Sequence, residues 1–255
     1  MNKNVFLLMF ALVIFLLSCN SDKDKCSTGN CKEGFGVFEY RNGDKYEGYW
    51  KDGKMDSIGS FRWIDGTKYF GHWKEARKDG WGDYLWPNGR VYKGYWKNDS
   101  KNGMGIMTWK NGNKYAGGWK DDRMDGKGIL QWKSGKKYDG YWMNGKKNGK
   151  GILITAEGES YDGDWVDDRM EGTGTYKWKS GASYTGEWKD DKMDGQGIYH
   201  ETTGNTIVGI WKEGNIIQSS SGSMESPELR NVNSEIQRVL QQMEFERKNP
   251  HQNHF

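Results

Sequence analysis

Apolar and polar residues alternate along most of this chain, and the alternation recurs with a period of 23 residues. Each period contains Tyr-x-Gly-x-Trp, which places three residues at every second position. Because side chains alternate between the two faces of a β-strand, these three are predicted to share one face, with the intervening polar residues on the other. The tyrosines are Tyr46, Tyr69, Tyr92, Tyr115, Tyr138, Tyr161 and Tyr184, and the tryptophans are Trp50, Trp73, Trp96, Trp119, Trp142, Trp165, Trp188 and Trp211.

A second alternating segment follows in each period and opens with Gly-x-Gly. The residue two positions after the second glycine is always apolar: Phe61, Tyr84, Met107, Leu130, Leu153, Tyr176 and Tyr199. Asp-, Asn- and Gly-rich dipeptides such as Asn88-Gly89 separate the segments, and they suit the positive φ values of tight hairpin turns. Each period is therefore predicted to form a β-hairpin of two short strands.

These hairpins are expected to stack on one another. A lone hairpin is marginally stable in water, and a short fixed period means that each unit packs on its neighbours in an elongated array. At about 4.8 Å between strands, roughly sixteen strands make a ribbon on the order of 75 Å long. The glycines on the aromatic face are expected to leave room for the Trp ring of the neighbouring repeat to lie flat against the backbone.

The repeated pattern resembles the MORN (membrane occupation and recognition nexus) repeat, whose signature is Tyr-x-Gly-x-Trp-x-x-Gly-x-x-x-Gly-x-Gly. Residues 115–128 read Tyr-Ala-Gly-Gly-Trp-Lys-Asp-Asp-Arg-Met-Asp-Gly-Lys-Gly, and the resemblance covers residues 34–214. It departs where Ser57 replaces the first Gly of Gly-x-Gly, and where four residues replace the usual turn glycine: Asp99, Asp122, Asp168 and Asp191. The resemblance implies an all-β fold, an elongated single-layer antiparallel β-meander. It also implies roles in scaffolding, dimerisation or membrane association, with no chemistry intrinsic to the repeat.

The N-terminus has a different composition. Lys3 precedes an apolar run from Val5 to Leu17, which is typical of a secretory signal helix and short for a membrane span, although an uncleaved anchor helix is the alternative. Leu16-Leu17-Ser18-Cys19 resembles the lipobox of bacterial lipoprotein signal peptides. This resemblance implies that residues 1–18 are removed and that Cys19 carries a diacylglycerol thioether and an acyl chain such as palmitate on its amino group. We therefore expect a protein of the bacterial cell envelope, lipid-anchored to a membrane.

The mature chain is expected to consist of a tether, a stack of repeats and a tail. A polar tether spans 19–33, the ribbon spans 34–214 with seven full repeats over 46–206, and a serine-rich linker spans 215–226. A short C-terminal α-helix is predicted over 227–247, followed by a disordered tail over 248–255. Its apolar positions recur at spacings of three and four: Leu229, Val232, Ile236, Val239, Leu240 and Met243. A cap over the last hairpin, a dangling helix and coiled-coil pairing are the alternatives for this segment.

Cys26 and Cys31 remain after lipidation of Cys19. An exported protein meets an oxidising environment, so a small disulfide loop between them is possible, and free thiols are the alternative. A zinc site is not expected, because no second Cys/His pair accompanies them.

Composition and charge narrow the function further. The net charge is only +3 and the mean hydropathy is −1.00, so 14 Trp and 14 Tyr must supply the apolar area that a fold requires. Lys and Asp alternate without forming a basic stripe, so no nucleic-acid partner is predicted. The acidic turns, such as that around Asp121, Asp122 and Asp125, lack the alternating spacing of a calcium loop. No catalytic constellation, metal or cofactor is predicted, and the protein is expected not to be an enzyme.

The aromatic residues outside the repeated columns are the candidates for a partner surface. They are Tyr49, Trp81, Tyr95 and Tyr141. We expect a membrane-tethered, non-enzymatic scaffold that binds a protein partner. The alternative is binding of cell wall or another glycan through exposed aromatic rings. Phospholipid binding by the repeats themselves is less favoured, because their charges are balanced.

Overall fold

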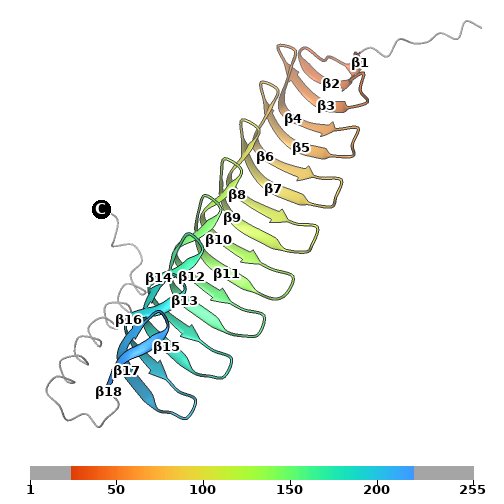
Figure 1. Ribbon diagram of the computed structural model, residues 1–255. Coiled ribbons are helices and arrows are strands. Elements are labelled where there is room, and N and C mark those ends of the chain that lie inside the picture. Colours follow the sequence, from red (N-terminus) through yellow and green to blue (C-terminus); the bar gives the residue numbers. More distant parts are fainter. Residues whose placement is uncertain (1–23, 221–255) are drawn as a thin grey trace, which may run out of the picture.

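The computed structural model describes residues 24–220, which form one open sheet of 18 antiparallel strands. Each strand pairs with the next along the chain, so the hairpins lie side by side along a single axis (Figure 1). This confirms the predicted all-β meander of hairpin repeats. The predicted signal helix and Cys19, and the predicted C-terminal helix and tail, lie outside the described residues. No helix in residues 24–220 has the length and apolar character needed to cross a membrane.

Strands of seven and nine residues alternate through the repeats. The strands are β1 Lys25–Gly29, β2 Gly34–Glu39, β3 Lys45–Lys51, β4 Lys54–Arg62, β5 Lys68–Lys74, β6 Arg77–Leu85, β7 Val91–Lys97, β8 Ser100–Thr108, β9 Lys114–Lys120, β10 Arg123–Gln131, β11 Lys137–Met143, β12 Lys146–Ile154, β13 Ser160–Val166, β14 Arg169–Lys177, β15 Ser183–Lys189, β16 Lys192–His200, β17 Thr206–Lys212 and β18 Asn215–Ser220.

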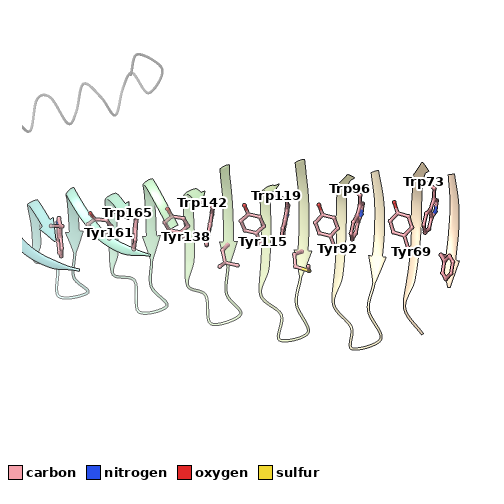
Figure 2. Close-up of a cluster of buried hydrophobic side chains, with 14 of the residues drawn as sticks. Tyr69, Trp73, Tyr92, Trp96, Tyr115, Trp119, Tyr138, Trp142, Tyr161 and Trp165 are labelled. Atoms are coloured by element: carbon pink, nitrogen blue, oxygen red, sulfur yellow. The ribbon is translucent and has the colours of Figure 1, made fainter. Parts of the chain in front are cut away.

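The core is built around a row of alternating Tyr and Trp rings on one face of the sheet, here called the inner face (Figure 2), and Phe61, Met107 and Leu130 are buried beside it. Each tyrosine meets the Trp of its own repeat and the Trp of the next repeat edge-to-face. The ring centroid of Tyr92 lies 5.1 Å from that of Trp96 and 5.5 Å from that of Trp119. The seven tyrosines are fully buried. Such contacts add to the burial of large apolar rings, so the row couples every repeat to its neighbours.

Paired glycines make room for the tyrosine ring of their own repeat. Gly48 on β3 pairs with Gly59 on β4, and a Cβ atom on Gly48 would lie 2.5 Å from the hydroxyl oxygen of Tyr46. That hydroxyl reaches past the glycines and donates a hydrogen bond of 3.0 Å to the carbonyl oxygen of Tyr49. The expectation that the neighbouring Trp lies over these glycines is therefore wrong. Tyr46 is two residues before Gly48 on the same strand, and its ring occupies the space over both glycines.

Each Trp instead stands beside the tyrosines and binds the preceding strand. The indole N–H of Trp73 donates a hydrogen bond of 3.2 Å to the carbonyl oxygen of Gly59, and Trp96 makes the same bond to Gly82. A buried indole thus keeps its donor satisfied, as burial of a polar group requires.

The turns also link successive repeats. Asp99 donates its backbone N–H to the carbonyl oxygen of Lys78 at 3.0 Å, and its carboxylate accepts the backbone N–H of Lys78 at 2.9 Å. Asp122, Asp168 and Asp191 repeat this two-way contact with the preceding repeat. Where the turn residue is Gly145, only the backbone bond to Met124 remains. The acidic residues that replace the usual turn glycine therefore connect neighbouring hairpins.

The sheet extends beyond the predicted 34–214 at both ends. β1 lies within the predicted polar tether 19–33, and β18 lies within the predicted linker 215–226. Pairing of β1 with β2 and of β18 with β17 satisfies the backbone groups of strands that would otherwise be sheet edges. These contacts outweigh the polar composition on which the two boundaries were predicted.

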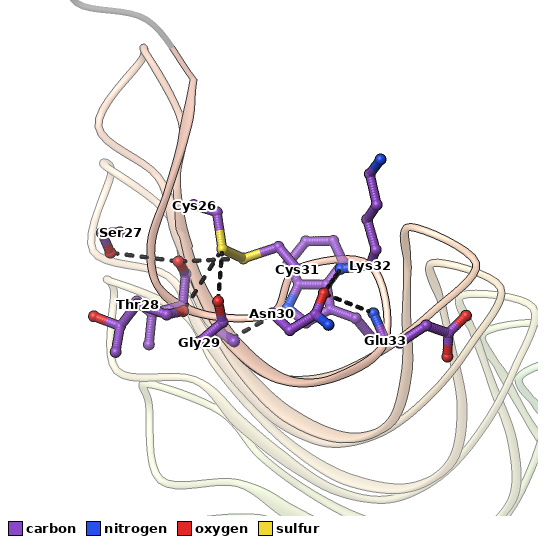
Figure 3. Close-up of a disulfide and its surroundings, with 11 residues drawn as sticks. Cys26, Ser27, Thr28, Gly29, Asn30, Cys31, Lys32 and Glu33 are labelled. Carbon is purple, nitrogen blue, oxygen red and sulfur yellow. Dashed lines mark hydrogen bonds between the residues drawn. A yellow bond between two sulfur atoms is a disulfide. The ribbon is translucent and has the colours of Figure 1, made fainter.

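A disulfide closes the N-terminal end of the ribbon. Cys26 and Cys31 are joined across the loop between β1 and β2, with their Cα atoms 5.9 Å apart (Figure 3). Asn30 supports the loop, because its side-chain oxygen accepts the backbone N–H groups of Lys32 and Glu33. The Cys31 sulfur lies over Gly36, much as a tyrosine ring lies over the glycines of the later repeats. The disulfide thus fills the inner face where no preceding Tyr exists.

Candidate interaction surface

The face opposite the aromatic core, here called the outer face, carries the predicted partner residues. Tyr49, Trp81, Tyr95 and Tyr141 are 45–50% exposed. Trp81 on β6 pairs directly with Tyr95 on β7, and their rings meet edge-to-face with centroids 5.3 Å apart. Phe35 and Tyr49 make the same kind of pair on β2 and β3, at 5.7 Å. The structure therefore places all four predicted residues on one face, three of them within aromatic pairs.

Several further apolar residues share this surface. Residues at the middle position of Gly-x-Gly and those two positions further on project from the same face. We call the whole set the outer stripe: Phe35, Tyr49, Ile58, Phe70, Trp81, Tyr95, Met104, Ile106, Ile129, Tyr141 and Ile152. It runs from β2 to β12, about 50 Å at the usual strand spacing. Period-two alternation could have found the aliphatic members, but attention to aromatic residues alone missed them.

A hollow interrupts the outer stripe near its middle. Gly118 stands where other repeats carry a side chain such as Tyr95 or Tyr141, and a Cβ atom there would overlap the carbonyl oxygen of Asp125. The resulting hollow of about 660 Å³ is lined by Met104, by the backbone at Gly118 and by polar groups that include Asn102 and Asp121. An apolar wall beside polar groups suits insertion of a partner side chain or a small polar ligand.

The stripe ends towards the C-terminus. The equivalent pair on β12 and β13 is Lys150 with Asp164, which form an ion pair of 2.8 Å. The next pair is Thr173 with Glu187. At these positions the outer face therefore changes from large exposed apolar residues in the first repeats to small or charged residues in the last.

The family to which the repeats belong is clear from a comparison with protein-family models. The MORN repeat model matches residues 32–45, 46–68, 69–89, 92–114, 115–137, 138–160, 161–183 and 184–206. The chain belongs to the MORN repeat family. No curated protein matches its sequence.

Similar solved structures include the TCP domains of two other proteins. The TCP10 domain of Danio rerio CPAP is 13% identical, with a TM-score of 0.41, covering 78% of this chain and 94% of that chain. The SAS-4 (dCPAP) TCP domain of Drosophila melanogaster, in complex with a proline-rich motif of Ana2, is 12% identical. It has a TM-score of 0.32 and covers 74% of this chain and 90% of that chain.

The inner face of the MORN repeats holds three lysines against the Trp rings. The ammonium groups of Lys78, Lys101 and Lys147 lie 4.5, 4.8 and 3.9 Å from the centroids of Trp96, Trp119 and Trp165. Burial lowers the pKa of Lys78 and of Lys147. In the other repeats Met55, Met124, Met170 and Met193 take this position. The lysines act as methionine does, covering aromatic rings with their alkyl stems.

Most of the clear pKa shifts belong to the structural row and its turns. Burial raises the pKa of all seven core tyrosines. Burial, with a hydrogen bond to Glu159, raises the pKa of Tyr176 to about 12. Hydrogen bonds to Thr67 lower the pKa of the Asp65 carboxyl in its turn. Within residues 24–220, no three His, Cys, Asp or Glu side chains are grouped so that they could hold a metal ion.

Proposed function

We propose that this chain is a membrane-tethered lipoprotein whose MORN-repeat ribbon is a non-enzymatic scaffold, binding a protein partner through the outer stripe. One observation carries this proposal. The repeated Tyr and Trp rings are buried in the inner row, whereas large apolar residues remain exposed along the opposite face from β2 to β12. Exposed apolar patches of this extent mark interaction surfaces, and Trp and Tyr are the side chains that most often supply binding energy there.

A rigid and extended surface supports scaffolding rather than catalysis. The outer stripe lies on regular strands that are fixed by the ring row beneath them, so its side chains are held in place before a partner arrives. Preorganisation of this kind lowers the entropic cost of binding. The shifted pKa values of the core tyrosines follow from their burial in the structural row, and this gives those groups a role in stability.

The tether limits the distance between the ribbon and the membrane. If Cys19 carries lipid, five residues separate it from Lys25, where β1 begins. Because an extended chain spans at most about 3.6 Å per residue, this segment reaches at most about 20 Å. Two or three acyl chains bind a bilayer durably. The first repeats, which carry the Phe35–Tyr49 pair, are then held close to the membrane surface of the bacterial cell envelope.

Co-purification from detergent extracts tests the protein partner. The double variant Trp81→Ala/Tyr95→Ala should recover at least tenfold less of the partner than the unmodified chain. The matched control is Thr173→Ala/Glu187→Ala, which removes the pair at the same strand positions beyond the end of the stripe and should retain the partner. Equal retention by both variants would refute the outer stripe as the binding surface. Turnover of a substrate by the pure protein would refute the non-enzymatic role.

Glycan binding is the second candidate, because the half-exposed Trp81–Tyr95 pair lies beside the hollow at Gly118 with its amide and carboxylate groups. Aromatic faces stack on sugar rings, and the polar groups can bind hydroxyls. Retention on purified cell wall, lost in Tyr49→Ala and Tyr95→Ala and kept in the Thr173→Ala/Glu187→Ala control, would favour this function over protein binding.

A further inference from the structure

The outer face of the last repeats forms a platform of β-branched residues. Its members are Thr175, Thr185, Ile198, Val208 and Ile210, on β14 to β17, and we call them the C-terminal platform. All five are half-buried or buried, although they occupy the face on which the outer stripe is exposed. Flat surfaces of β-branched side chains are the kind of sheet face against which helices pack.

Ile198 shows that something covers this platform. It is 7% exposed, whereas Ile106, Ile129 and Ile152 at the same position of earlier repeats are 47%, 38% and 41% exposed. The cross-strand neighbours of Ile198 are Thr185 and Val208. Thr and Val side chains each have one heavy atom fewer than those of Asp139 and Asp162, which lie beside the exposed Ile152. The difference therefore requires a cover above the sheet.

The opposite end of the ribbon offers a comparison. Val37 occupies the equivalent position in the first hairpin and is also buried, at 9%. The strand beside Val37 is irregular, because the register of β1 on β2 shifts between Cys26 and Thr28, and the hydroxyl of Ser27 donates a hydrogen bond to the Val37 carbonyl oxygen. Ile198 has a regular strand on each side, as the exposed isoleucines do, so its cover comes from elsewhere in the chain.

The segment after β18 has the position and pattern to supply that cover. Residues 221–255 lie outside the described structure and continue from Ser220, on the strand next to β17. Ile198 on β16 is two strands from β18, about 10 Å, within easy reach of the linker. The apolar positions from Leu229 to Met243 cover 15 residues, whose 14 steps span about 21 Å of helix. That length crosses about four strands, which is the width of the platform.

We propose that residues 227–247 pack as an amphipathic helix across the outer face of β14 to β17. The apolar residues Val232, Ile236 and Leu240 then meet the C-terminal platform, and the exposed edge of β18 is not their docking site. The outer face is thereby divided in two. The outer face of the last repeats is covered by the chain's own helix, and the outer stripe of the earlier repeats remains accessible to a partner.

Limited trypsin digestion of the full chain in detergent tests this proposal, because Arg230 and Arg238 lie within the segment. Cleavage at both should be at least tenfold faster in Ile198→Asp than in the unmodified chain. The matched control, Ile129→Asp, changes the same position of an earlier repeat and should leave cleavage unchanged. Equal cleavage of Ile198→Asp and the unmodified chain overturns the proposal. Faster cleavage in Ile217→Asp than in Ile198→Asp also overturns it, in favour of docking at the β18 edge.

A second variant guards against misfolding of the sheet. Leu240→Asp changes only the segment, and it should also expose Arg230 and Arg238, whereas Gln241→Asp on the polar side should not. Near-ultraviolet circular dichroism of the Tyr–Trp row should stay constant in all these variants. The segment could instead be exchanged between two copies of the chain. In that case the molecular mass would rise to that of a dimer with increasing protein concentration, and protection of Arg230 and Arg238 from trypsin would be lost on dilution. This result would overturn packing within one chain.

Discussion

The phenol ring of Tyr138 lies directly over Gly140, and a Cβ atom on that glycine would sit 2.6 Å from the tyrosine hydroxyl oxygen. The same hydroxyl donates a hydrogen bond of 3.0 Å to the carbonyl oxygen of Tyr141. Tyr138 also meets Trp142 and Trp165 edge-to-face, so its position links one repeat to the next. The absence of a side chain at Gly140 thus allows Tyr138 to contact both Trp rings and keeps the aromatic row unbroken.

Replacement of Gly140 by alanine should therefore destabilise the ribbon. The added methyl would also lie 2.5 Å from the Cα of Gly151 on the facing strand, so neither neighbour can move away without cost. We expect a loss of about 1–3 kcal/mol in the free energy of unfolding, as for other overpacked cores. Urea denaturation measures it, with Lys114→Ala on the exposed surface as the control. Equal unfolding midpoints for the two variants would contradict this packing.

Alkaline pH should unfold the protein cooperatively. Burial raises the pKa of the seven core tyrosines above the ordinary 10.0, so the folded state binds their protons more tightly than the unfolded state. Stability from this source is fully present below pH 10 and falls as the pH rises above it. The lowered pKa values of Lys78 and Lys147 act in the opposite direction, but they are two groups against seven.

Absorbance at the tyrosinate wavelength measures this effect during a pH titration. Ionisation of the core tyrosines should coincide with loss of the near-ultraviolet dichroism, and both should occur well above pH 10. Gradual ionisation of all 14 tyrosines near pH 10 with the fold intact would show that the row is open to solvent.

Ser57→Gly should stabilise the protein. Ser57 has a φ of 59°, in the left-handed region, at a position where the later repeats have glycine, such as Gly80 and Gly103. A residue with a Cβ pays about 1–2 kcal/mol for this conformation, and the greater freedom of glycine in the unfolded chain offsets part of the gain. We expect a net increase of about 0.5–1 kcal/mol, seen as a higher unfolding midpoint in urea. A lower midpoint would show that the Ser57 hydroxyl, which donates to Asp56, contributes more than the strain costs.

Cys19→Ser should abolish lipid attachment. A hydroxyl cannot form the thioether that the lipobox resemblance implies, so labelled palmitate should appear in the unmodified chain and not in the variant. The variant should also retain its signal segment and run as a larger species on a denaturing gel. Cys26→Ser/Cys31→Ser is the matched control and should be labelled as the unmodified chain is. Label in Cys19→Ser would refute the lipobox assignment.

Much of the fold could be predicted from the repeated columns. Tyr46, Gly48 and Trp50 alternate with polar residues, and this alone predicts their shared face and the hairpin. The ends could not be predicted in this way, because Lys25–Gly29 and Asn215–Ser220 lack the repeated residues and become strands by pairing with a strand that is already formed. The local sequence pattern does not show which strand of the finished sheet has a free edge for these segments to pair with.

The candidate surface was predicted in part. Tyr49, Trp81, Tyr95 and Tyr141 were found because they are aromatic and stand outside the repeated columns. Met104 and the hollow at Gly118 were not, because the hollow depends on how closely β9 and β10 approach, and that distance is set by the sheet.

The sequence by itself determined the hairpin unit, its period and the face on which the aromatic residues lie, because strand alternation and turn chemistry act over a few residues. Only the tertiary structure decided that Tyr138 rather than a neighbouring Trp covers the paired glycines. It also decided that Asp99 binds the preceding repeat and that Ile198 is buried where Ile129 is exposed. These outcomes depend on contacts between strands, and the distances across a sheet are fixed only once all of its strands are in register.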